Sequence, residues 1–401
     1  MLRVGTFTAL QRNPNYRLYW IGALTSNLGT WMQFVAQGWL VYELTGSTLM
    51  LGVVGFAQSA PFLVLSLYGG VLADRFERRR LMVWTQSGMM LHGFVLAGMT
   101  LTGTVTAWWV VALAAIYGAI NAINTPVRQA IVADLVRRDD LQNAIALNSL
   151  QFQSSRTVGP AIAGLVLATY GAGWCFLANA LSFIAVIFTL LRMDLPPLEP
   201  RPRPPALAAI RESLRYVQSE PILLAALLLT AVPSLFSMPY QHLMPAVASD
   251  VLRTGPEGFG VLQSASGIGA VVSAFAIASL GRRGGGTTQL VALIVGGVGV
   301  TAFGLSTLVP ASVVAVFVAG LGHMAFMSLN MTGIHSRVTE EMRGRVTALL
   351  TMMVFGLQPL SALLSGAVAA AIGVQNTLAL SGFFCAGIAI AAAILVPKLR
   401  A

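Results

Sequence analysis

Charged residues are scarce in this 401-residue sequence. Asp, Glu, Lys and Arg make up only 9% of it, whereas 56% of the residues are hydrophobic. Soluble domains are about a quarter charged, so a soluble protein of this size would lack the charge to cover its surface. The formal net charge of +10 does not indicate a nucleic-acid partner, because the arginines stand in short segments between long apolar runs.

Cysteine is almost absent. Cys175 and Cys385 both fall in apolar segments, where a single cysteine usually behaves as a small hydrophobic residue. The sequence also lacks a Gly-x4-Gly-Lys-Ser/Thr run to bind the phosphates of ATP, a nucleophile elbow and a His–Glu cluster. We therefore expect no disulfide, no metal, no cofactor and no enzymatic activity, and ATP is not the direct energy source.

Long apolar runs dominate the rest of the sequence. A run of about 20 apolar residues crosses the hydrocarbon core as a helix, which satisfies every backbone N–H and C=O group internally. The runs do not alternate as the strands of a membrane barrel would. The sequence predicts an all-α protein with twelve membrane spans: 17–42, 50–73, 81–101, 106–127, 141–168, 173–191, 221–244, 257–280, 288–308, 311–333, 345–371 and 375–396.

The arginines and lysines predict the orientation. Alternate loops are basic, and the loops between them carry a single arginine, Arg253. Because basic loops stay in the cytoplasm, we expect a multi-pass protein of the bacterial inner membrane with both termini cytoplasmic. The residues assigned to the inside are Arg75, Arg78, Arg79, Arg80, Arg137, Arg138, Arg282, Arg283, Arg337, Arg343, Arg345, Lys398 and Arg400.

The segment 193–218 divides the sequence into two halves. It starts with a proline-rich stretch, which favours an extended chain, and continues with an amphipathic stretch expected to form a surface helix. We predict an N-terminal six-helix bundle at 1–192, a cytoplasmic linker at 193–218 and a C-terminal six-helix bundle at 219–401. The motif that begins at Gly55 recurs at Gly260, which indicates a parallel repeat unless the match is a coincidence of Ala/Gly-rich sequence.

The most specific motif follows the second predicted span. Its glycine, acid and arginines have the spacing Gly-x-x-x-Asp-Arg-x-x-Arg-Arg, which resembles the loop 2–3 signature of the major facilitator superfamily. A plain basic loop is the alternative interpretation. By this resemblance the motif takes part in gating, through Gly70, Asp74, Arg75, Arg78 and Arg79.

Other stretches resemble the enterobactin-exporter and macrolide-efflux branch of that superfamily, mostly in the N-terminal half. They are the stretches 15–20, 39–47 and 144–149 and the motif Arg156-x-x-Gly159-Pro160-Ala161-x-Ala163-Gly164. The resemblance implies proton-driven export of a small molecule by a monomer in the lipid bilayer, and it assigns Gly159, Pro160 and Gly164 to helix packing. A lipid or lysophospholipid flippase of the same fold is the alternative, and siderophores, macrolides, lipophilic drugs and sugars remain open as substrates.

Arg156 is the leading candidate for substrate binding. It lies near the middle of the fifth predicted span, where a charge is costly and is by default a functional hypothesis. Its guanidinium would suit an anionic or polyphenolic substrate; the alternative is a structural arginine that binds carbonyls freed by Pro160. Amides and an aromatic residue complete the predicted site, although amides also bond helices together: Gln33, Gln37, Asn121, Gln151 and Trp31.

Proton coupling lacks an obvious residue, because no acidic side chain lies deep in a predicted span. The candidates for proton coupling are Glu43, at the outer end of the first span, and His323, in the tenth. Histidine titrates in the appropriate range, but a single histidine in a membrane helix is also commonly structural.

Overall fold

The computed structural model describes residues 6–193, 206–280 and 285–397. Its described residues form helices and no strand, as the sequence predicts. They cluster into two units, the first of residues 1–40 and 60–202 and the second of residues 41–59 and 203–401. The domain boundaries predicted at 192 and 219 stay predictions, and the proline-rich part of the predicted linker lies outside the described residues.

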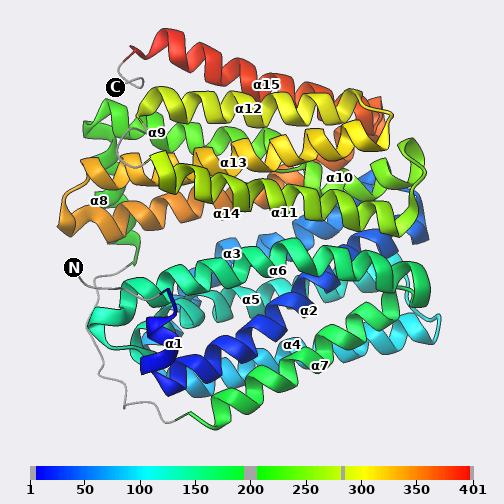
Figure 1. The fold of residues 1–401 in the computed structure, drawn as a ribbon, viewed down its shortest axis with the longest axis horizontal. Helices are drawn as coiled ribbons and strands as arrows, with labels where there is room; N and C mark the ends of the chain where they lie inside the picture. Colours follow the sequence, from blue (N-terminus) through cyan, green and yellow to red (C-terminus); the bar gives the residue numbers. More distant parts are fainter. Residues whose placement is uncertain (1–5, 194–205, 281–284, 398–401) are drawn as a thin grey trace. The chain divides into compact units, whose positions relative to one another are not determined.

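The helices of the N-terminal part include several of membrane length. Figure 1 shows them in the blue to green part of the ribbon. They are α1 (Thr8–Arg12), α2 (Pro14–Thr45), α3 (Thr48–Arg75), α4 (Arg78–Leu101), α5 (Ala107–Leu135), the 3₁₀ turn η1 (Arg138–Asp140), α6 (Leu141–Tyr170) and α7 (Ala172–Leu191).

The C-terminal part also contains long helices, and the π-helical turns η2 and η3 interrupt its first one. In order they are α8 (Ala206–Ser219), α9 (Pro221–Val232), η2 (Pro233–Ser237), α10 (Tyr240–Ala246), η3 (Val247–Val251), α11 (Gly255–Leu280), α12 (Gly286–Leu305), α13 (Val309–Arg337), α14 (Glu340–Ile372) and α15 (Val374–Leu395).

Nine helical stretches of the described chain are long and apolar enough to cross a membrane. α2, α4 and α6 are also long enough, at 32, 24 and 30 residues, but they carry more polar or charged side chains. The polar residues on α2 and α6 are the ones that matter for the candidate site.

Two predicted spans end too early. The fourth was expected to end at residue 127, but α5 continues past Pro126 to Leu135. The seventh was expected to end at 244, but the helical path runs from Pro221 to Val251. Proline is tolerated inside membrane helices because neighbouring groups and local π turns satisfy the freed carbonyls, and the π turns η2 and η3 lie within this path.

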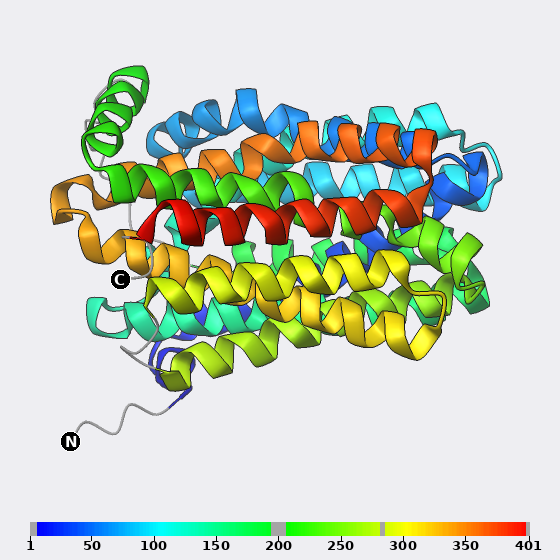
Figure 2. The same ribbon diagram turned by 90° about the horizontal axis from the view of Figure 1, so that it is seen from above.

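The two units share a pattern of helix neighbours. In the first unit α4 packs against both α5 and α7, and in the second α12 packs against both α13 and α15. Figure 1 and the turned view of Figure 2 both show α12 flanked by α13 and α15. Buried Gln–Asn bonds join equivalent pairs: the Gln86 and Asn124 side chains are 3.5 Å apart, and those of Gln289 and Asn330 are 2.7 Å apart.

Equivalent turns also match. Gly171 between α6 and α7 has φ +87°, and Gly373 between α14 and α15 has φ +86°. A residue with a side chain adopts such a conformation only with strain, so glycine is the residue that fits. Both glycines end an overlong helix that contains a proline, Pro160 in α6 and Pro359 in α14.

The helix predicted in the linker is present as α8. Its apolar side buries Ser213 and Val217, and Val217 belongs to a hydrophobic cluster with Ile334, Val338 and Val346. Its polar side carries Glu212, whose carboxylate lies 2.6 Å from the Arg345 guanidinium. Figure 2 shows α8 crossing the direction of the long helices of its unit.

Within the second unit, the end of α2 and the start of α3 pack closely on α14. A Cβ added to Gly52 would lie 2.6 Å from the carbonyl oxygen of Ala362, and one added to Gly366 would lie 2.6 Å from that of Thr48. The Tyr42 hydroxyl donates a hydrogen bond to the Asp250 carboxylate on η3. Small residues therefore let the backbones touch here.

Candidate functional site

An arginine lies over an indole in the first unit. The guanidinium carbon of Arg156, on α6, is 5.8 Å from the ring centroid of Trp31 on α2, within the range of a cation–π contact. The Trp31 ring also meets Phe34 and Phe152 edge-on, with centroids 5.7 and 5.8 Å apart. Phe152 and Arg156 lie one turn apart on α6 and share a face.

These residues remain partly accessible. Phe152 is exposed, and Trp31, Phe34 and Arg156 are half-buried. The structure thus joins two residues that the sequence predicted separately, Trp31 and Arg156, into one aromatic and cationic surface that a planar anion would fit. We call these four residues, together with Arg128 on α5 and its hydrogen-bond acceptor Asn27 on α2, the "arginine–aromatic patch".

Gly159 allows this geometry. A Cβ added to it would lie 2.7 Å from Cβ of Trp31 and 3.2 Å from the carbonyl oxygen of Leu28, so a side chain there would push α6 away from α2. Pro160 and Gly164 are also buried. Gly159 lies against Trp31, and a packing role for the whole motif stays a prediction.

Polar bonds hold α2 and α6 together below the patch. The Gln151 amide donates to the carbonyl oxygen of Trp20 at 2.6 Å, and the Trp20 indole N–H donates to that of Leu147 at 3.2 Å. The Tyr16 hydroxyl donates to the carbonyl oxygen of Ala144 at 2.8 Å. These bonds fix the register of the two helices that present Trp31 and Arg156.

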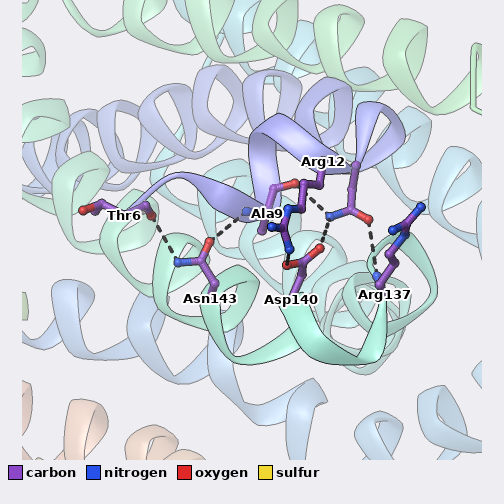
Figure 3. Close-up of polar contacts among 7 residues, drawn as sticks. Thr6, Ala9, Arg12, Arg137, Asp140 and Asn143 are labelled. Atoms are coloured by element: carbon purple, nitrogen blue, oxygen red, sulfur yellow. Dashed lines mark hydrogen bonds and ion pairs between the residues drawn. The ribbon is translucent and has the colours of Figure 1, made fainter. Parts of the chain in front are cut away.

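A further group of polar contacts lies at the start of α6, where Asp140 contacts α1 and the residue that follows it (Figure 3). The Asn13 amide donates to Asp140 Oδ2 and to the carbonyl oxygen of Ala9, both at 3.0 Å. Arg12 lies 3.7 Å from the other carboxylate oxygen, and Asn143 accepts a hydrogen bond from the Ala9 N–H at 2.9 Å. Asp140 is 4% exposed and Asn13 7%, so this cluster, the "Asp140 clasp", is a buried polar connection.

The predicted amides occupy different surroundings. Gln33 is buried, and its side-chain oxygen accepts a 2.7 Å hydrogen bond from the Asn179 amide on α7. Gln151 is buried in the bond to Trp20, and Gln37 is also buried. For Gln33 and Gln151, bonding between helices is the observed arrangement. Asn121 is half-buried on α5, and a substrate role for these amides stays a prediction.

Arg128 belongs to the patch and was missed at the sequence level. It lies on α5, in the stretch beyond the predicted end of the fourth span, and its guanidinium donates to Asn27 Oδ1 at 3.4 Å. Its spacing from Asn121 and Asn124, seven and four residues, places the three on one side of a helix. If the predicted helix had been continued past Pro126, that spacing would have indicated that Arg128 belongs to the same polar face as Asn121 and Asn124.

The predicted coupling residues lie in the second unit. Glu43 is exposed near the end of α2, and His323 is buried on α13. Sequence reasoning missed Asp250, since the seventh predicted span stopped before it. Asp250 forms a hydrogen bond with Tyr42. It is therefore a third candidate, after Glu43 and His323, to test for proton coupling.

The basic loop motif is described in part. α3 ends at Arg75, and the side chains of Gly70, Asp74 and Arg75 lie outside the described residues. Arg78 forms an ion pair with Asp134 on α5. Arg79 donates to the carbonyl oxygens of Met193, at 2.8 Å, and Leu191, at 3.2 Å, where an arginine satisfies the open carbonyls of a helix end. A gating role for the motif stays a prediction.

No group of three or more His, Cys, Asp or Glu side chains in the described part of the chain is placed to hold a metal ion. Cys175 and Cys385 are both buried and free.

Comparison with known proteins identifies the class of this fold. A bacterial homologue of the human lysosomal transporter Spinster, in an inward-facing state, superposes with a TM-score of 0.75 at 14% identity over 97% of this chain and 98% of that one. A bacterial homologue of the iron transporter ferroportin gives 0.72 at 16% identity over 97% and 99%. The fold is therefore that of a multi-pass membrane transporter.

Sequence comparison names the family. The family model MFS_3, "Transmembrane secretion effector", matches residues 4–401, and the chain belongs to the major facilitator superfamily. The chain is 27% identical to the Staphyloferrin A transporter of Staphylococcus aureus, over 88% of this chain and 89% of that one. It is 28% identical to the multidrug efflux pump Tap of Mycolicibacterium fortuitum, over 98% of both. It is 26% identical to the enterobactin exporter EntS of Citrobacter koseri, over 98% and 94%.

These relatives are transporters and not enzymes. The predicted recognition of the superfamily and of its exporter branch is confirmed, as is the prediction of a membrane transport protein.

Proposed function

We propose that this protein exports an organic small molecule across the bacterial inner membrane by alternating access, and that the arginine–aromatic patch binds the cargo. The observation that carries the proposal is the Arg156 guanidinium held over the Trp31 ring. A charged group in the middle of a membrane helix is by default a functional hypothesis, and an indole offers a flat surface for stacking.

Export is proposed from the relatives. Two of the three are named as an exporter and an efflux pump, and two are named for siderophores. A siderophore or a drug-like molecule with anionic or phenolic groups suits a patch made of arginine and aromatic side chains, because guanidinium binds such oxygens with paired hydrogen bonds.

For the whole molecule we propose twelve spans in two six-helix bundles, with both termini in the cytoplasm. The matching neighbours of α4 and α12 support the repeat, as do the paired glycine turns at Gly171 and Gly373. The orientation rests on the distribution of arginine. Coupling to protons, a monomeric state and binding of the cargo from the cytoplasm belong to the same proposal.

The test measures accumulation in cells. A strain lacking the gene is compared with the same strain expressing the protein, across a panel of siderophores and antibiotics. We expect one chemical class to accumulate in the deletion strain and to be cleared on expression. Arg156→Gln and Trp31→Ala should fail to clear it, since each removes one side of the cation–π contact.

Arg192 provides the matched control. It also lies over a ring, with its guanidinium carbon 4.6 Å from the Phe188 centroid, but just beyond the end of α7. Arg192→Gln should clear the cargo as the unchanged protein does. The proposal is wrong if no compound in the panel changes its accumulation, or if the Arg156 and Trp31 variants both clear the cargo fully.

A further inference from the structure

The helix α8 has one side that its own unit does not cover. Ser213 and Val217 are buried against the unit, whereas four residues on the opposite side are exposed. Their positions differ by three, one and three residues, so they share one face of the helix. The name "exposed face of α8" is used for Arg211, Leu214, Arg215 and Gln218.

The two flanks of this helix differ in polarity. With 3.6 residues per turn, Leu214 and Glu212 point to nearly opposite flanks. The carboxylate of Glu212 lies 2.6 Å from the guanidinium of Arg345 on α14, so this flank is held to the unit by an ion pair. Leu214 is 42% exposed, so the other flank presents an apolar side chain next to two arginines.

The arginines of the exposed face keep their positive charge unpaired. Among the described residues, neither Arg211 nor Arg215 forms an ion pair. The sequence from 201 to 215 contains four arginines and a single acid, Glu212. Because Arg345 already pairs with that acid, α8 carries an excess of positive charge on its exposed face.

α8 lies level with the ends of the long helices. Val217 packs with Val338, which follows α13, and with Met342 in the first turn of α14. Figure 2 shows α8 crossing the direction of the long helices of its unit. A helix with this location and direction lies along the membrane surface, where lipid headgroups meet the acyl chains.

We propose that the exposed face of α8 binds the headgroups of anionic phospholipids. Arg211 and Arg215 contact the phosphates, because guanidinium binds phosphate oxygens with paired hydrogen bonds. Leu214 enters the boundary between headgroups and acyl chains, as the apolar residues of surface helices do. A zwitterionic headgroup has the same phosphate, but its own cation offsets the charge that attracts the arginines.

The full-length protein, reconstituted in vesicles, tests this directly. Gln218→Cys carries a nitrobenzoxadiazole label on the exposed face, and the unchanged chain, whose Cys175 and Cys385 are buried, gives the background labelling. Brominated acyl chains quench the label and are supplied on phosphatidylglycerol in one sample and on phosphatidylcholine in the other. Each arginine near an anionic surface adds about fivefold in association, so we expect at least a fivefold preference for phosphatidylglycerol.

Replacing both arginines separates their charge from the fold. Arg211→Gln together with Arg215→Gln should bring the preference close to one, whereas Arg211→Lys together with Arg215→Lys should retain most of it. High salt should weaken the preference in the unchanged face, because screening shortens the range of the attraction. Equal quenching by the two lipids, or an unchanged preference in the double glutamine variant, overturns the inference.

A second arginine pair of the same unit provides the matched control. Arg337 and Arg343 are also exposed, but they stand next to Glu340 and Glu341 in the chain. Arg337→Gln together with Arg343→Gln removes the same charge and should keep the preference for phosphatidylglycerol. If this control loses the preference as fully as the α8 variant does, the attraction comes from net charge and the site on α8 is wrong.

This inference does not depend on the proposed function. The vesicles contain no cargo and no gradient, so the lipid preference is measured without transport. Loss of export with an intact preference, or intact export with no preference, therefore identifies which of the two proposals is wrong.

Discussion

Gly159 decides how closely α6 approaches α2, and thereby whether Arg156 reaches Trp31. Its missing side chain leaves room for the Cβ of Trp31 and for the Leu28 carbonyl oxygen. Alanine at this position would place a methyl group where two backbones already touch. The packing of one glycine is therefore tied directly to the geometry of the patch.

We expect Gly159→Ala to lower the free energy of unfolding in detergent by about 1–3 kcal/mol, the usual cost of overpacking. It should also weaken binding of aromatic anions, because α6 carries Phe152 and Arg156 away from Trp31. Denaturant unfolding and titration with an aromatic anion measure the two effects.

Gly98 is the matched control, since a Cβ added there has no neighbour within 4 Å. Gly98→Ala removes helix-destabilising flexibility without a clash and should keep both stability and binding. Gly159→Ala with unchanged stability and binding would show that α6 is free to shift.

At the scale of elements, the Asp140 clasp connects α1 to the start of α6. Asp140 and Asn13 are both buried, so the hydrogen bond between them replaces bonds that each would otherwise make to water. Removing one member leaves the other short of a hydrogen bond in a buried setting, which costs more than the bond itself contributes.

We expect Asn13→Ala to lower the free energy of unfolding by about 1–3 kcal/mol and to speed amide hydrogen exchange in residues 8–16. The double variant Asn13→Ala, Asp140→Ala should cost less than the sum of its single changes, because the two residues act together. Asp139 is exposed next to Asp140, and Asp139→Ala should change stability by less than about 0.5 kcal/mol. Strict additivity would mean that the clasp is not a coupled unit.

For the whole molecule, coupling to protons requires a titratable group that responds to the transport cycle. Glu43 and His323 are the predicted groups, and the structure adds Asp250, which holds Tyr42 in the second unit. The end of α2 and the start of α3 rest on α14 and η3 through this bond and the glycines at 52 and 366.

We expect that at least one of Glu43→Gln, His323→Ala and Asp250→Asn abolishes transport driven by a pH gradient while leaving exchange of cargo at equal pH intact. Neutralising the coupling group removes the proton step but not the binding site. Uptake into inverted vesicles, with and without an imposed gradient, measures this.

Glu257 is exposed at the start of α11, and Glu257→Gln is the control that should remain coupled. If all three variants stay fully coupled, none of these groups carries the proton.

Much of the fold was predictable because the membrane imposes a simple rule: a helix of about 20 apolar residues is the local solution for a chain in lipid. The apolar runs therefore predicted the helices, Arg156 stood out as a charge in the middle of such a helix, and Trp31 was predicted as an aromatic residue of the substrate site. The predictions failed near Pro126 and Pro245, where the helix continues because neighbouring structure compensates for the proline. Arg128 and Asp250 were missed for that reason.

The sequence by itself determined that this is a helical membrane protein, since that follows from composition and run length, and its motifs resemble those of the major facilitator superfamily, to which the family model assigns it. Only the tertiary structure decided which side chains meet. Trp31 and Arg156 are 125 positions apart, and Asn27 and Arg128 are 101 apart. Their contacts depend on how closely α2, α5 and α6 pack, and that is set by Gly159 and by buried polar bonds such as that between Gln151 and Trp20. Local sequence does not contain this information, because each helix would form in lipid whichever neighbour it had.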